Sequence, residues 1–351
     1  MDTKEFLRRL CEGVGVSGYE HGLVDTVREA MSPYVARVTV DAMGNCWAVR
    51  AGQAPEPRVK IMLAAHMDEI GLMVSKYEDG GFLRVVEVGG FDPRALIGQE
   101  VIVHTATGDL PGIIGIKPPH IMTDEDRKKA PPLHELFVDV GLDDAAARAA
   151  VAVGDVITLK REFVELAGEI VAGKALDDRA GIAVMLECLK RLTQLHHSAD
   201  VYAVATVQEE VGLKGAATGA HAINPDIGVA IDVGHAGPGL PEHESINIGG
   251  GPAIAIGANI HPKLYALLVA TAKECGIAYQ EDVSPGRTGT DAWSMQISRE
   301  GIPTALLSLP LRYMHTSVET GSMADIRAAG RLLAEFCARV DRALVEGLRW
   351  D

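Results

Sequence analysis

The sequence predicts an α/β protein with a mixed, largely parallel sheet, helices on both of its faces, and an inserted β-rich segment. Helical and strand-like segments alternate before residue 70 and resume after about residue 165, which is typical of such sheets. Between them, short strand-like pieces punctuated by glycine indicate a small barrel or sandwich. The length of 351 residues suits about two domains. We therefore expect a discontinuous domain of residues 1–70 and 164–351, with residues 71–163 inserted into it.

Local patterns place the individual elements along the chain. Helices are expected where apolar residues recur with a period of about 3.6, and strands where apolar runs are short. The expected helices are 4–14, 21–35, 143–151, 178–192, 213–220, 261–275 and 324–347. The expected strands of the main sheet are 37–42, 45–50, 59–65, 201–207, 226–232 and 303–309. Those of the insertion are 71–77, 81–88, 100–108, 111–117 and 155–160. Asp143 or Asp144 would cap the helix at 143–151, and the charged segment 123–135 is expected to be an exposed loop.

Composition and charge restrict the class of partner. The chain is 47% apolar and 23% charged, which is ordinary for a globular protein. Its formal net charge is −15 and no stretch forms a basic stripe, so we expect neither nucleic acid nor an anionic membrane as a partner. Five scattered cysteines, no CxxC pair, no signal peptide and no membrane-spanning run predict a reduced, cytoplasmic protein. Gly13, Gly15 and Gly18 match GxGxxG but follow a helix, which argues against a dinucleotide site.

Five metal-capable side chains each follow an apolar, strand-like run. They are His66, Asp177, Glu210, Asp232 and His315. Because open α/β sheets place their chemistry outside the carboxyl ends of the strands, we expect these side chains to meet at one edge. Two imidazoles and three carboxylates suit two divalent ions that share one carboxylate and leave a position for water. The pattern predicts a two-metal hydrolase.

The two histidines also have a plainer interpretation. In a strand, residues two apart point to the same side, so Asp68 could reach the second nitrogen of His66 and fix its tautomer. Alternatively, His66 is a strand-end histidine beside a solvated aspartate, and His315 is a packed histidine. The coincidence of five such segments in one chain favours the metal site.

The acidic pairs leave alternatives open as well. Asp177 and Asp178 begin a helix, and one of them, preferably Asp178, would cap it, which leaves Asp177 free to bridge two ions. Glu209 and Glu210 repel each other unless something compensates, so one could ligate while the other acts as general base. A solvated turn would explain the same pair. Asp232 ends its apolar run either as a ligand or as a cap.

At these residues the chain resembles the tetrahedral (TET) aminopeptidases, the glutamyl-aminopeptidase-like family of cocatalytic metallopeptidases. The similar motifs run through nearly the whole chain in order, and no metal ligand is missing. They are SGYE (17–20), AAHMDEIGLMV (64–74), GIKPPH (115–120), ALDDRAG (175–181), QEEVGLKGA (208–216), IDVG (231–234), GRTGTDA (286–292) and RYMHTSVE (312–319).

The resemblance implies two divalent ions per subunit, zinc or cobalt, and a role for each candidate ligand. His66 and Asp232 would bind one ion, Glu210 and His315 the other, and Asp177 would bridge them. Members of this family often carry a cis peptide bond between the two aspartates of the DDR motif, here Asp177 and Asp178.

The resemblance also implies the catalytic and substrate-binding residues. Glu209 would be the general base and acid for a water that bridges the two ions, and Asp68 would orient His66. Gly289, Thr290 and Asp291, within GRTGTDA, are expected to shape the substrate pocket. The expected reaction is the stepwise removal of N-terminal residues from peptide substrates.

Fold and assembly follow from the same resemblance. The α/β part would be a zinc-exopeptidase-like three-layer sandwich, and residues 71–163 would be a PDZ-like dimerisation domain. Dimers of this kind build hollow tetrahedral dodecamers in the family. Two other functions remain open from the sequence: a two-metal N-acyl-amino-acid deacylase or deblocking amidohydrolase, and a catalytically idle assembly protein.

Overall fold

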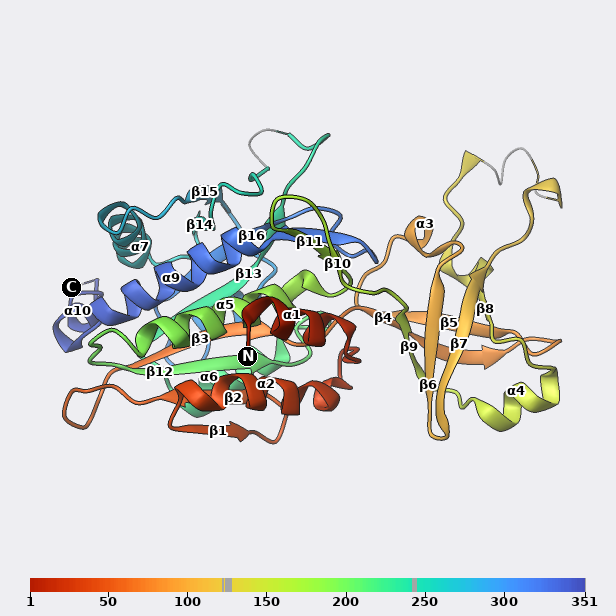
Figure 1. The fold of residues 1–351 in the computed structure, drawn as a ribbon, viewed down its shortest axis with the longest axis horizontal. Coiled ribbons are helices and arrows are strands. Elements are labelled where there is room, and N and C mark those ends of the chain that lie inside the picture. The colour runs from red at the N-terminus through yellow and green to blue at the C-terminus, as the bar shows by residue number, and fades with distance from the viewer. Residues whose placement is uncertain (122, 124–127, 242–244, 351) are drawn as a thin grey trace.

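The computed structural model describes residues 1–121, 123, 128–241 and 245–350. The chain forms a large α/β lobe and a smaller β-barrel that project side by side, with both described ends in the α/β lobe (Figure 1). The fold class expected from the sequence is confirmed. None of the helices within the described ranges is long and apolar enough to cross a membrane.

The α/β lobe is built on a mixed eight-stranded sheet with the order β1-β2-β12-β3-β13-β16-β14-β15. Its central strands β12, β3, β13 and β16 pair in parallel, and β14 pairs in parallel with β15. The remaining neighbours are antiparallel. The strands are β1 (Arg37–Val40), β2 (Cys46–Arg50), β3 (Lys60–His66), β12 (Asp200–Thr206), β13 (Ile227–His235), β14 (Ala253–Ile256), β15 (Gln280–Val283) and β16 (Thr304–Leu311). The sequence did not predict β14 and β15.

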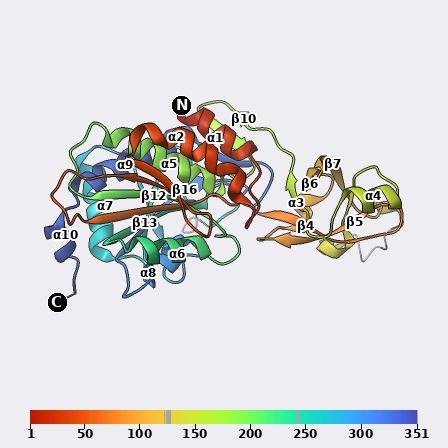
Figure 2. The ribbon, with the colours of Figure 1, turned by 90° about the horizontal axis from the view of Figure 1, so that it is seen from below.

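Helices cover both faces of this sheet. Alternate residues of β3 enter two different apolar cores, with Ile61 and Leu63 on one side and Met62 and Ala64 on the other. This explains why the central strands are apolar almost throughout. Figure 2 shows α1, α2, α5 and α9 on one side of the sheet and α6 and α8 on the other. The helices are α1 (Thr3–Glu12), α2 (Val24–Met31), α5 (Leu176–Leu192), α6 (Lys214–Ile223), α7 (Pro262–Glu274), α8 (Asp291–Gln296), α9 (Met323–Arg339) and α10 (Arg342–Glu346).

The single helix expected over 324–347 is wrong, because α9 and α10 are separate helices. Val340 takes an extended backbone conformation after the last residue of α9. The side chain of Asp341 then accepts a hydrogen bond from the backbone N–H of Leu344 at 2.8 Å and so caps α10. Helical periodicity continues across this break, so the pattern alone did not reveal it.

A second, three-stranded sheet joins two segments that are far apart in the sequence. It has the order β10-β11-β17, formed by β10 (Val164–Glu165), β11 (Ile170–Gly173) and β17 (Glu319–Ser322). In the antiparallel pairing of β11 with β17, Gly173 lies opposite Glu319. The start of α5 and the segment before β17 are thereby brought together.

The β-rich segment forms a closed antiparallel barrel with the order β4-β5-β8-β7-β6-β9. Alternate residues such as Leu72, Val74, Val101 and Val103 fill its interior. Asp143 caps the short helix of this segment by accepting from the backbone N–H of Ala146. Of the loop expected over 123–135, residues 124–127 lie outside the described residues. The elements are β4 (Gly71–Tyr77), β5 (Leu83–Val88), α3 (Pro93–Leu96), β6 (Glu100–Thr105), β7 (Gly108–Gly115), β8 (Phe137–Asp139), α4 (Asp144–Ala150) and β9 (Val156–Leu159).

A buried ion cluster ties the N-terminal segment to the end of β3 and the start of α5. The Glu69 carboxylate lies 2.6 Å from Lys174 Nζ and 3.1 Å from Arg179 Nη2, and all three side chains are buried. The Arg179 guanidinium also donates to the backbone carbonyls of Leu10 and Met67. The cluster therefore connects these three segments through ion pairs and hydrogen bonds. Removing one of its charged side chains would leave the remaining buried charges without a partner.

We predict that Glu69→Ala lowers the free energy of unfolding by about 3–5 kcal/mol, since two buried cations lose their shared carboxylate. Urea denaturation followed by circular dichroism would measure the change. Glu100→Ala, which removes an exposed pair with Lys160, is the control and should leave stability nearly unchanged. Equal, small effects of both substitutions would contradict the prediction.

Candidate metal centre

The five candidate ligands converge at one edge of the α/β lobe. His66 is the last residue of β3, and Glu210 and His315 lie in the loops that follow β12 and β16. Asp177 lies in the first turn of α5, outside the main sheet, where its backbone is not yet helical. Asp232 lies within β13, which continues to His235, so the expectation that Asp232 ends its strand is corrected. The carboxyl ends of parallel strands still bring the set together.

The Asp177 carboxylate lies between the two imidazoles. Its Oδ1 is 3.1 Å from His66 Nε2, and its Oδ2 is 3.4 Å from His315 Nε2. Glu210 Oε1 is 3.3 Å from the same His315 nitrogen. One carboxylate that faces two imidazoles through different oxygens is the arrangement that a bridging ligand requires.

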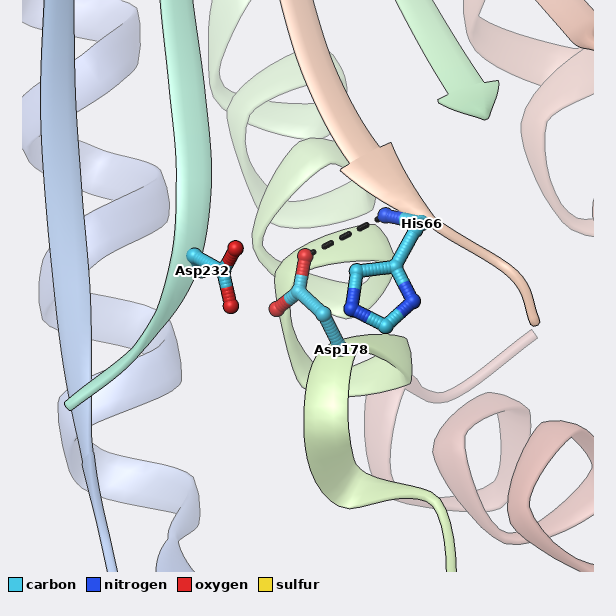
Figure 3. A group of neighbouring side chains, drawn as sticks. All are labelled: His66, Asp178 and Asp232. Atoms are coloured by element: carbon cyan, nitrogen blue, oxygen red, sulfur yellow. Dashed lines mark hydrogen bonds between the residues drawn. The ribbon is translucent and has the colours of Figure 1, made fainter. Parts of the chain in front are cut away.

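Figure 3 shows the Asp178 carboxylate between the His66 ring and the Asp232 carboxylate. Ligand atoms of His66, Asp178 and Asp232 all lie within 4.8 Å of one another, and the same holds for His66, Asp177 and Glu210. Both oxygens of Asp178 accept backbone hydrogen bonds, from His66 N–H at 3.3 Å and Gly181 N–H at 3.1 Å. Asp178 thus caps the regular part of α5, which begins after the non-helical residues Asp177 and Asp178, as the sequence indicated. The peptide bond between Asp177 and Asp178 is cis, as the resemblance led us to expect.

Buried negative charge dominates the electrostatics of the site. Burial raises the pKa of Glu209 to about 10, and the neighbouring carboxylates of Asp232 and Asp291 add to this effect while the His66 ring opposes it. Burial also raises the pKa of Asp232 well above its usual value, and the charge of Asp177 adds to the shift. Hydrogen bonds to Asp177 and Glu210 raise the pKa of His315 to about 11. Each carboxylate that is ionised here therefore calls for positive charge nearby.

The residues present fit two divalent cations. Within the described part of the chain, the side chains that form ion pairs with Asp177, Glu209 and Glu210 are the imidazoles of His66 and His315. No lysine or arginine of that part takes this place. Nitrogen and oxygen donors in this number suit zinc, cobalt or manganese.

The second nitrogens of both imidazoles face backbone carbonyls. His66 Nδ1 is 3.0 Å from the carbonyl oxygen of Asp68, closer than the 3.6 Å to the carboxylate oxygen of the same residue. His315 Nδ1 is 2.9 Å from the carbonyl oxygen of Gly90, in the loop after β5 of the barrel. Such contacts fix the orientation of a ligating imidazole. The sequence offered no signal for Gly90, because every residue has a backbone carbonyl and its role here does not depend on the side chain.

Asp68 contacts more than His66. Its carboxylate accepts hydrogen bonds from Ser17 Oγ at 2.6 Å and from the backbone N–H groups of Glu209 and Glu210 at 3.0 and 3.1 Å. The carboxylate therefore holds the loop that follows β12. This contact was not expected from the spacing of His66 and Asp68.

Glu319 is a further residue that the sequence reasoning missed. It is buried, and its two carboxylate oxygens accept from the backbone N–H groups of Asp177 at 3.0 Å and His315 at 2.9 Å. Burial raises the pKa of Glu319 to about 8. Its place at the end of the RYMHTSVE motif was the available signal. Glu319 thus spans the backbones of two candidate ligands.

The three residues expected at the substrate pocket differ in exposure. Asp291 is buried and accepts from Thr206 Oγ1 at 2.6 Å, while Thr290 is buried and caps α8. Gly289 is exposed, with φ +73°. A small cleft reaches Asp177 and Glu210. Substrate binding by residues 289–291 stays a prediction.

Comparison with known proteins identifies the family. The M42 glutamyl aminopeptidase model matches residues 44–332. The lysyl aminopeptidase of Pyrococcus furiosus is 39% identical over 346 residues, which cover 95% of this chain and 97% of that protein.

Solved structures agree with this match. An aminopeptidase from the archaeon Desulfurococcus kamchatkensis is 40% identical, with a TM-score of 0.92 over 99% of this chain and 98% of that one. The TET1 peptidase of Pyrococcus horikoshii, which can assemble into a tetrahedron or a large octahedral shell, is 32% identical. Its TM-score is 0.85 over 97% of this chain and 100% of that one. The resemblance seen in the motifs is confirmed: the chain belongs to the M42 glutamyl aminopeptidase family.

Proposed function

We propose that this protein, an aminopeptidase of the M42 family, works with two divalent ions held at the carboxyl ends of its sheet. The observation that carries the proposal is the Asp177 carboxylate, which turns one oxygen toward each of two imidazoles. His66 and Asp232 would hold one ion, His315 and Glu210 the other, and Asp177 would bridge them. Zinc or cobalt suits these donors.

Each protein group has a distinct part in the proposed reaction. The bound ions would polarise the scissile carbonyl and lower the pKa of a water between them. Glu209 takes the proton of the attacking water and passes it to the leaving amine. Its carboxylate accepts no hydrogen bond from the described residues, and its nearest ion-pair partner is His66 Nε2 at 4.0 Å. Asp68 and Glu319, by contrast, are engaged with backbone N–H groups.

Glu209→Gln should lower kcat by about 100- to 10,000-fold, because the amide cannot accept the proton, while both ions stay bound. Steady-state kinetics and metal analysis of the same samples would check this. Glu210→Gln is the matched neighbour and should lose metal, because it removes a proposed ligand. Turnover by Glu209→Gln at the rate of the unmodified enzyme would exclude Glu209 as the base.

Hydrolysis of a panel of aminoacyl-anilides and short free-amine peptides should depend on the metal. Chelated enzyme should be inactive, and zinc or cobalt should restore the release of N-terminal residues, since the bound ions would supply the positive charge that polarises the scissile carbonyl. The panel would also show the preferred side chain. Release of acetate from acetylated amino acids, without cleavage of free-amine peptides, would instead indicate the deacylase.

We also propose that the barrel, residues 71–163, is a dimerisation domain and that dimers assemble into a tetrahedral dodecamer. The Pyrococcus horikoshii peptidase, which resembles this chain over its whole length, supports the assembly. The barrel carries exposed apolar side chains, including Val86, Ile113 and Val153, and exposed apolar groups of this size often mark interfaces.

Light scattering should therefore give the mass of twelve copies of the 37.3 kDa chain. Ile113→Arg should reduce this mass if the barrel forms the dimer contact, because a charge cannot be buried there without a partner. An unchanged melting temperature would show that the variant is folded. A mass of one chain for the unmodified protein would exclude the assembly.

A further inference from the structure

The N-terminal segment 15–20 lies against the loop that carries Glu209. Val16 forms a parallel bridge with Glu69, just beyond the end of β3. Backbone hydrogen bonds run from Ser17 N–H to Glu69 O at 3.3 Å and from Glu69 N–H to Gly15 O at 2.9 Å. The segment therefore pairs with the chain just beyond the end of β3, beside the metal centre. This pairing places Ser17 and Glu20 next to residues 208–210.

Ser17 acts on this loop through Asp68. The Ser17 hydroxyl donates to Asp68 Oδ2 at 2.6 Å, and the Asp68 carboxylate accepts from the backbone N–H groups of Glu209 and Glu210. Both Ser17 and Asp68 are buried. Because the serine fixes one oxygen of the carboxylate, it also fixes the direction from which the two N–H groups are held.

Glu20 acts on the loop directly. Its Oε1 accepts from the backbone N–H groups of Gly18 at 2.8 Å and Gln208 at 2.9 Å. Gln208 has φ +55°, a left-handed conformation that costs energy for a residue with a side chain. A hydrogen bond to its N–H helps to hold this conformation, which sets the path of the chain into Glu209.

The burial of Glu20 is costly and calls for a reason. The side chain is 5% exposed, and its hydrogen-bond partners among the described residues are backbone N–H groups, with no lysine or arginine. Burial raises the pKa of Glu20, and the charge of Asp68 adds to the effect. An apolar residue would pack at lower cost, so the carboxylate is explained by its hold on the loop rather than by packing.

We propose that Ser17 and Glu20 are positioning residues that together hold residues 208–210 in place, so that Glu209 and Glu210 reach the metal centre. Neither residue contacts the side chain of a proposed metal ligand directly. Ser17 acts through Asp68, and Glu20 acts through the backbone of the loop. The inference rests on the proposed role of Glu209 as the base. It assigns a function to the SGYE segment that the metal ligands alone leave unexplained.

Four variants test the inference. Ser17→Ala and Glu20→Ala should lower kcat by about 10- to 100-fold, the scale of a misplaced catalytic group, with a smaller change in KM. Glu20→Gln should keep most of the kcat that Glu20→Ala loses. Both N–H groups donate to a single oxygen, Oε1, and the amide of glutamine retains such an oxygen. Ser298→Ala, at a buried serine outside this contact set, is the matched control and should leave kcat unchanged.

Amide hydrogen exchange provides a readout that needs neither metal nor activity. In chelated protein, Ser17→Ala and Glu20→Ala should speed exchange at residues 208–210, while the core strand β13 stays protected. Unchanged exchange at 208–210 in both alanine variants would overturn the inference. So would loosening of the whole α/β lobe, or a Glu20→Gln variant as slow as Glu20→Ala, since either result indicates a merely structural role.

The same measurements separate this inference from the proposed function. If Glu209→Gln kept full activity while exchange at 208–210 still rose in the alanine variants, Glu209 would not be the base. The hold on the loop would nevertheless stand. If Glu209→Gln were inactive but the alanine variants matched the unmodified enzyme in kcat and exchange, only the positioning roles would fall.

Discussion

The concentration of carboxylates around two imidazoles is the constraint on which the rest of this structure depends. Asp177 lies between His66 and His315, with Asp232, Glu209 and Glu210 close by. Burying this much like charge is unfavourable unless cations or protons compensate it. In the part of the chain that the structure describes, the ion pairs of Asp177, Glu209 and Glu210 involve imidazoles and no lysine or arginine. The site is therefore arranged for positive charge supplied from outside the chain.

Buried carboxylates hold the segments of Asp177, Glu210 and His315 by accepting from their backbone N–H groups. Glu319 binds the backbones of Asp177 and His315, and Asp68 binds those of Glu209 and Glu210. Because these hydrogen bonds are made to the main chain, they fix the backbone position of the candidate ligands without occupying their side chains. The side chains stay available for ions and for proton transfer, which is the division that a preorganised active site requires.

The two lobes are joined at the metal centre. Strand β4 of the barrel begins at Gly71, only three residues after Asp68, and the carbonyl oxygen of Gly90 lies 2.9 Å from His315 Nδ1. Ser17, far earlier in the chain, reaches the same region through Asp68. A loop of the barrel thus orients the imidazole of His315, so the geometry of the metal centre depends on the barrel as well as on the α/β lobe.

The sequence by itself determined the fold class and most of the central elements, and it identified the candidate ligands, although it missed β14 and β15 and the break between α9 and α10. Periodicity identified the central strands and α5, and the ligand types of His66, Asp177, Glu210, Asp232 and His315 are visible in the residues themselves. Only the tertiary structure decided what holds them. Asp177 and Glu319 are 142 positions apart, and His315 and Gly90 are 225 apart. Contacts of this range, and those made by backbone carbonyls and N–H groups, leave no local pattern, because they exist only after β11 pairs with β17 and the loop after β5 of the barrel meets the loop after β16.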